Sequence, residues 1–202
     1  MTAARPRRVA LALALGALPS TAWAHLVSAR FGDFYTGLLH PLTAFENALP
    51  WLALGMFAGL QPRGRSRWLL LAFPLAVAAG AALAGATGEL PGLRLFNLLS
   101  FVVLGVLVAL GREVTQGALI AAGTVVGLAH GLENGLAFQR GGSLLLFVCG
   151  VGCAGYLLIT LAAAGTQVIA SRHDWGLIAA RAVGSWIAAI GIMMTGLALT
   201  AT

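Results

Sequence analysis

Two short clusters of polar residues lie inside long apolar runs, and their side chains could carry chemistry. The first is His40-Pro41 followed by Glu46-Asn47, and the second is Ala129-His130-Gly131-Leu132-Glu133-Asn134. Ionisable groups at membrane depth are expensive to keep, so they mark candidate functional sites. Imidazole nitrogens bind nickel, copper, zinc and iron, and carboxylates neutralise the charge of the ion. These residue types therefore point to a site for a divalent transition metal.

Other interpretations stay open for these side chains. His130 and Glu133 are three residues apart, so they share a helix face and could form only a buried ion pair or hydrogen-bonded pair. Chains of histidine and glutamate also relay protons in transporters. Thiols and thioethers suit Cu(I), so Cys149, Cys153 and Met193-Met194 are weaker metal candidates, although both residue types commonly serve ordinary apolar packing.

The composition places both clusters in a membrane protein. Of 202 residues, 59% are hydrophobic and only 9% are charged, whereas soluble domains carry about 25% charged residues. Apolar runs of about 20 residues favour membrane-spanning helices, which satisfy their own backbone hydrogen bonds. The net charge is +6, but the sequence has no basic patch with interleaved aromatic residues of the kind that binds nucleic acid. We therefore expect the lipid bilayer as a partner, and no nucleic acid.

Residues 1–24 have the pattern of a cleavable secretory signal peptide. Arg5-Pro6-Arg7-Arg8 forms the charged region, Val9–Leu18 is a short apolar segment, and Ala22-Trp23-Ala24 is a cleavage site. An uncleaved first transmembrane helix is the alternative. Cleavage would leave His25 at the mature N-terminus, where its imidazole and the free amine could chelate a metal together. A solvated terminal residue is the alternative for His25.

Residues 25–202 are expected to form one all-α membrane domain of six transmembrane helices. Arginines are more frequent in the predicted inner loops, which include Arg63, Arg65 and Arg67, than on the outer side. This bias predicts a multi-pass protein of a bacterial inner (cytoplasmic) membrane, with both mature termini in the periplasm. The spans are expected near 37–60, 67–86, 93–111, 116–138, 142–165 and 176–200.

The predicted topology brings the two polar clusters to similar depth on the outer side. His40 begins the first span, and in one continuous helix Asn47 would follow about two turns later on nearly the same face. Pro50 removes the N–H that would bond the carbonyl of Glu46, which predicts a kink there. The fourth span runs from the inner to the outer side, so His130 and Glu133 lie near its outer end. The residues expected to converge are His40, Glu46, Asn47, His130 and Glu133.

These clusters resemble the motifs of the HupE/UreJ family of six-helix membrane proteins. The matching features are Ala24 before His25, His40-Pro41-Leu42-x-x-x-Glu46-Asn47-x-Leu49, and Ala129-His130-Gly131-x-Glu133. The resemblance covers nearly the whole mature chain. In the family pattern, glycine, aspartate and histidine stand at the positions of Ala44, Glu46 and Asn47, and a further histidine stands at Val126.

The resemblance implies nickel uptake for the maturation of hydrogenase or urease. We expect binding and transport of a divalent transition metal, nickel first, with cobalt, copper or zinc as alternatives. His40 and His130 would be the primary ligands, Glu46 and Glu133 would neutralise the ion, and Asn47 and His25 would contribute at the outer side. A non-transporting accessory protein that supports a metalloenzyme partner is the second hypothesis, because the inner halves of the spans are mostly apolar. An enzyme is not expected, and an intramembrane metal-dependent hydrolase is the third and weakest hypothesis.

Overall fold

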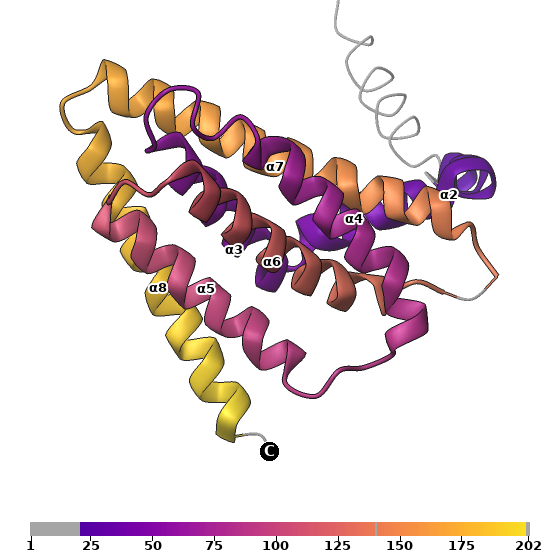
Figure 1. Ribbon diagram of the computed structural model, residues 1–202. Coiled ribbons are helices and arrows are strands. Elements are labelled where there is room, and N and C mark those ends of the chain that lie inside the picture. Colours follow the sequence, from indigo (N-terminus) through magenta and orange to yellow (C-terminus); the bar gives the residue numbers. More distant parts are fainter. Residues whose placement is uncertain (1–20, 140, 201–202) are drawn as a thin grey trace, which may run out of the picture. The chain divides into compact units, whose positions relative to one another are not determined.

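The computed structural model describes residues 21–139 and 141–200, with side chains from residue 32 onward. Every regular element in this part of the chain is a helix (Figure 1), which confirms the all-α prediction. The predicted cleavage point after Ala24 falls within the first described helix, and the rest of the predicted signal peptide and the side chain of His25 lie outside the described part. The helices are α2 (Thr21–Thr43), α3 (Phe45–Gly59), α4 (Leu69–Thr87), α5 (Leu93–Leu110), α6 (Gln116–Gly135), α7 (Leu144–Arg172) and α8 (Gly176–Thr200).

The chain divides into two units, residues 1–32 and residues 33–202, and the site lies in the second unit. Within it, α4, α5, α7 and α8 are long and apolar enough to cross a membrane. Their outward faces expose large apolar side chains such as Leu75, Ile178 and Trp186, which are 69 to 70% exposed. Helices that are apolar on both inner and outer faces are typical of a lipid environment. The described helices therefore fit a multi-pass membrane protein.

The first predicted span, residues 37–60, is not one helix. It is divided at Ala44, whose backbone is extended (φ −93°, ψ 109°), so α2 ends at Thr43 and α3 begins at Phe45. In the last turn of α2, the Thr43 hydroxyl donates to the backbone carbonyls of Leu39 and His40. The break at Ala44 comes before the position of the kink predicted from Pro50, and Pro50 itself lies inside α3. With 15 residues, α3 is shorter than the roughly 20 that a perpendicular crossing needs.

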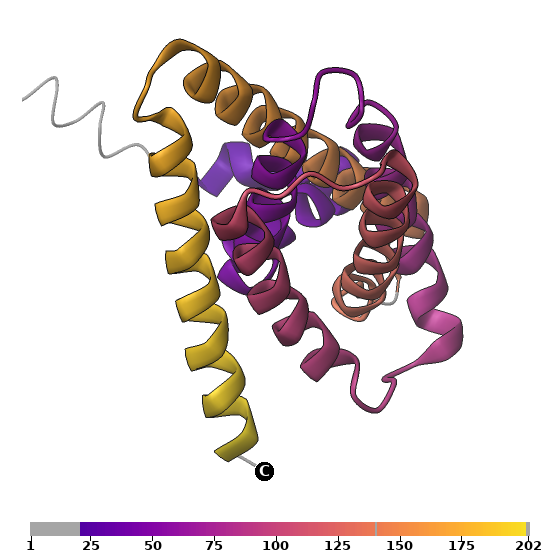
Figure 2. The ribbon, with the colours of Figure 1, turned by 60° about the vertical axis from the view of Figure 1, so that its left-hand side comes forward.

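Glycines let the helices of the second unit pack backbone to backbone. A Cβ atom on Gly80 of α4 would lie 2.3 Å from the carbonyl oxygen of Leu128 in α6, and one on Gly131 would lie 2.2 Å from that of Val77. Helix α5 approaches α8 in the same way at Gly105, and α8 runs beside α5 in both Figure 1 and Figure 2. Small residues of this kind bring membrane helices close enough for packing to drive their association.

Gln61 links the α3–α4 connection to the α5–α6 connection by hydrogen bonds, at the end of the bundle where α3 and α5 end. Its Nε2 donates to the carbonyls of Phe57 (3.3 Å) and Arg112 (3.2 Å), and its Oε1 accepts from the backbone N–H of Val114 (3.0 Å). Arg65 adds an ion pair to Glu113 at 3.2 Å. The loop that carries the predicted inner arginines is thus held against the α5–α6 connection.

Replacing Gln61 with alanine should lower the free energy of unfolding by about 1–2 kcal/mol, because three backbone groups lose a buried partner. Denaturant titration of the purified protein in detergent measures the change. The matched control is Glu113→Gln, which breaks an exposed ion pair in the same region and should cost less than about 1 kcal/mol. Equal losses in the two variants would contradict a structural role for the Gln61 bonds.

Candidate functional site

His130 lies at the centre of a buried polar network built from three helices. Its ring is 0% exposed. One ring nitrogen, Nε2, lies 2.9 Å from Ser100 Oγ of α5, and the other, Nδ1, lies 3.3 Å from Asn47 Oδ1 of α3. Trp51 packs edge-on against the imidazole, with ring centroids 6.3 Å apart. A histidine in this position is held in place by α3 and α5 and has no direct contact with solvent.

Asn134 completes the network one helical turn after His130. Its Nδ2 donates to Asn47 Oδ1 at 2.9 Å and to the backbone carbonyl of His130 at 2.8 Å, and its Oδ1 accepts from Asn47 Nδ2 at 3.4 Å. The Ser100 hydroxyl donates to the carbonyl of Asn97 at 2.7 Å, so its oxygen is free to accept from His130 Nε2–H. In that tautomer Nδ1 carries a lone pair that faces the Asn47 carbonyl oxygen. In the other tautomer Nδ1–H donates to Asn47 Oδ1, so the same contact is either a direct hydrogen bond or a lone pair that faces an amide oxygen.

Glu133 faces a second helix rather than the imidazole. Asn97 of α5, which is buried, donates from Nδ2 to Glu133 Oε2 and to the carbonyl of Ala129 (3.3 Å). A small hollow beside this contact is lined by Glu46, Arg94, Asn97, Leu98 and Glu133. Glu46 and Glu133 therefore approach the same place, at the end of the bundle where α3 and α5 begin and α6 ends.

The structure brings only some of the predicted ligands together. Asn47 and His130 are in contact, and Glu46 and Glu133 share the hollow. His40 does not stack above Asn47, because the break at Ala44 puts the two residues on different helices. The His40 ring has no hydrogen-bond partner among the described residues, and these residues contain no group of three or more His, Cys, Asp or Glu side chains placed to hold a metal.

Three members of the network were not among the predicted ligands. Asn134 ends the second cluster. Asn97 and Ser100 are three residues apart, so they share one face of α5, whose other residues are apolar apart from Arg94. An isolated polar residue in a membrane helix is the sequence signal for each of them. Their pairing with α3 and α6 depends on how the helices pack, which spacing along one helix does not reveal.

Replacing Ser100 with alanine should lower the free energy of unfolding by about 1–2 kcal/mol, because a nitrogen of the buried His130 ring loses its partner. Ser185→Ala is a suitable control: this serine is exposed and bonds only the backbone carbonyl of Arg181, so its loss should cost less than about 0.5 kcal/mol. Denaturant titration in detergent compares the two. A Ser100→Ala protein as stable as the Ser185→Ala protein would show that the Ser100–His130 contact contributes nothing.

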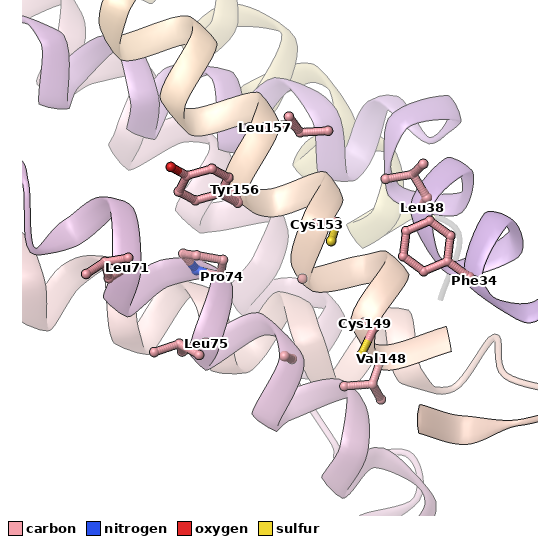
Figure 3. A pocket seen from close by; sticks show the side chains of 12 residues that line it. Phe34, Leu38, Leu71, Pro74, Leu75, Val148, Cys149, Cys153, Tyr156 and Leu157 are labelled. Carbon is pink, nitrogen blue, oxygen red and sulfur yellow. The ribbon is translucent and has the colours of Figure 1, made fainter. Parts of the chain in front are cut away.

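The sulfur-bearing candidates lie away from this network. Cys149 and Cys153 line an apolar pocket of about 580 Å³ between α2, α4 and α7, together with Phe34 and Tyr156 (Figure 3). Both thiols are free. Met193 on α8 is 67% exposed, whereas Met194 packs against the apolar core. Their surroundings are those of ordinary apolar packing.

Comparison with known proteins identifies the family of the chain. Protein HupE of Rhizobium leguminosarum bv. viciae is 29% identical over 187 residues, which cover 91% of this chain and 95% of that protein. No solved structure matches the chain significantly. The family described as HupE / UreJ protein matches residues 13–194, which is most of the sequence. The chain therefore belongs to the HupE/UreJ family.

Proposed function

We propose that this protein binds a divalent transition metal, nickel first and cobalt or copper next, at His130 and carries it across a bacterial inner membrane. Membership in the HupE/UreJ family implies a membrane protein with an accessory or transport role in nickel or metal handling, and not an enzyme. Maturation of a metalloenzyme such as hydrogenase is the process that this metal would serve. The metal is the cargo of the protein.

The observation that carries the proposal is the polar network inside an otherwise apolar bundle. His130 is fully buried, and Asn47, Ser100, Asn97 and Asn134 are each at least nine-tenths buried. Buried polar groups in a membrane are costly, so their presence marks a candidate functional site. The neighbouring buried positions of α5 are filled by the apolar side chains of Leu98, Phe101 and Leu104. Packing of the bundle alone would therefore not require polar residues at these depths.

The geometry beside His130 suits a metal ligand pair. The distance of 3.3 Å between His130 Nδ1 and Asn47 Oδ1 is close to the separation of two ligands on one ion, when each is about 2.1 Å from a tetrahedral metal such as zinc. Imidazole supplies affinity for nickel, cobalt, copper and zinc, and the amide oxygen adds a weaker ligand. Glu133 follows one turn later on α6 and Glu46 begins α3, so negative charge stands near the same end of the bundle.

A non-transporting accessory protein is the second candidate, and one observation favours it. Apolar side chains fill the bundle between the His130 network and the Gln61 end, including the fully buried Leu54, Phe101 and Val108. A metal that reached His130 would meet no polar side chain along these residues. A protein of this kind would bind the ion and release it on the same side.

Uptake into liposomes separates the two candidates. The purified protein is reconstituted into vesicles that contain a nickel-sensitive dye, and nickel chloride is added outside. We expect dye quenching in vesicles with the wild-type protein and none in vesicles with Glu133→Gln, which removes the negative charge nearest to the network. Stoichiometric binding in detergent without quenching would establish the accessory role and exclude transport.

A further inference from the structure

The end of the second unit where α3, α5 and α7 finish is strongly basic. Figure 2 shows the α3–α4 and α7–α8 connections at this end. The three connections there and the first two turns of α8 contain two acidic residues, Glu113 and Asp174, and six arginines: Arg63, Arg65, Arg67, Arg112, Arg172 and Arg181. Among the described residues, the ion pair within 4.0 Å joins Arg65 to Glu113, so the other five arginines have no carboxylate partner there. This is the end predicted to face the cytoplasm.

Arg181 lies among side chains of the outer, apolar face of α8. It is exposed, and it comes three residues after Ile178 and five before Trp186, which are 70% and 69% exposed. Its Nε donates to the carbonyl of Ala109 near the end of α5 (2.7 Å). In the described part of the chain, the four N–H groups on its two Nη atoms have no acceptor. Such donors at membrane depth need a partner, because acyl chains supply no acceptor.

Arg112 places a second positive charge beside Arg181. The Cδ atom of Arg181 lies 3.7 Å from the position that a Cβ atom on Gly111 would take, and Arg112 is the next residue. The Arg112 side chain is exposed and bonds no other described residue, although its backbone carbonyl accepts from Gln61. Two like charges at short range repel each other, and an anion between them removes this repulsion. The pair therefore favours an anion at the place where α5 ends against α8.

We propose that Arg112 and Arg181 bind the headgroup phosphate of an anionic phospholipid, whose acyl chains lie along the outer surface of α5 and α8. Guanidinium groups bind phosphate through paired N–H donors, and basic pockets between transmembrane helices bind anionic headgroups. A lipid fits better than an acidic protein, because the exposed apolar side chains of Leu110 and Ile178 lie beside the two arginines. The exposed Trp175 just before α8 is typical of a helix end at headgroup level.

Native mass spectrometry tests the site, because it resolves each lipid bound to the protein. The protein in detergent is titrated with phosphatidylglycerol or with phosphatidylcholine that has the same acyl chains. We expect the wild type to bind one phosphatidylglycerol about thirtyfold more tightly than phosphatidylcholine, the effect of two arginines beside one anionic headgroup. Arg112→Gln/Arg181→Gln should remove this preference. Arg63→Gln/Arg67→Gln, which removes the same charge from exposed positions at the same end, should keep it.

Two single variants complete the test. Arg112→Gln removes a side chain that bonds no other described residue, so it should fold like the wild type and lose about fivefold in preference. His130→Gln should keep the full preference, because its ring contacts neither arginine. Equal binding of the two lipids by the wild type would overturn the inference, as would equal loss of preference in both double variants. Displacement of the bound lipid by inorganic phosphate would also overturn it, because the site would then select a free anion.

Discussion

Replacing His130 with alanine should reduce nickel affinity by at least a hundredfold. The imidazole is the only strong transition-metal ligand in the network, because the remaining members among the described residues are amides, a hydroxyl and a carboxylate. Its ring nitrogens face Ser100 Oγ and Asn47 Oδ1, so removal of the ring leaves a hydroxyl and an amide there, which are weaker ligands for nickel than imidazole. Isothermal titration of nickel chloride into the metal-stripped protein measures the affinity.

Two further variants keep this prediction interpretable. His130→Ala removes a fully buried ring and should also cost about 3 kcal/mol of stability, by analogy with other large-to-small substitutions. His130→Gln retains a hydrogen-bonding side chain and should fold better, but should lose nickel binding as well. His173→Ala removes an exposed imidazole that stacks on Trp175 between α7 and α8, and should bind nickel like the wild type. Unchanged affinity in His130→Gln would exclude His130 as a ligand.

Gly131→Ala should destabilise the protein by about 3 kcal/mol or more, the upper range for overpacking. The added Cβ would lie 2.2 Å from the carbonyl oxygen of Val77 and 3.0 Å from its Cα, so the clash is with backbone and no rotamer relieves it. Helices α4 and α6 must then separate, and the shift would also move His130 away from Asn47 and Ser100. We therefore expect weaker nickel binding along with lower stability.

A second glycine on the same helix provides the control. Gly117 of α6 has open space where a Cβ would be placed, so Gly117→Ala should leave stability unchanged or raise it by up to about 1 kcal/mol through helix propensity. Denaturant titration in detergent compares the two alanine variants. If both behave alike, the close contact between α4 and α6 does not contribute to stability.

Much of the fold could be predicted from apolar run length, because the bilayer allows few other structures. The expected spans at 67–86, 93–111 and 176–200 differ from α4, α5 and α8 by only a few residues at any end. The first span was wrong as a single helix. The chain uses an extended Ala44 to turn between α2 and α3, and alanine, with its high helix propensity, gives no local signal of a break.

Part of the candidate site could be predicted from the sequence. The rest could not, because contacts between helices determine it. The free-energy cost of burying an ionisable side chain marks His130 and Glu133 as candidate site residues in an apolar helix. Both contact polar partners in the structure. Helical periodicity misplaced His40 relative to Asn47, because it assumes an unbroken helix. Ser100 and Asn134 were not predicted as members because contacts between helices decide their roles. The six-span count, the signal peptide and His25 as a ligand stay predictions.

The metal content of the purified wild-type protein tests the central claim most directly. The protein is loaded in detergent with equal amounts of nickel, cobalt, copper and zinc, passed through a desalting column, and analysed for metal by mass spectrometry. We expect about one transition-metal ion per chain, with nickel the most abundant, and no bound ion in His130→Gln. Wild-type protein that retains none of the four metals would contradict the assignment of a metal site at His130.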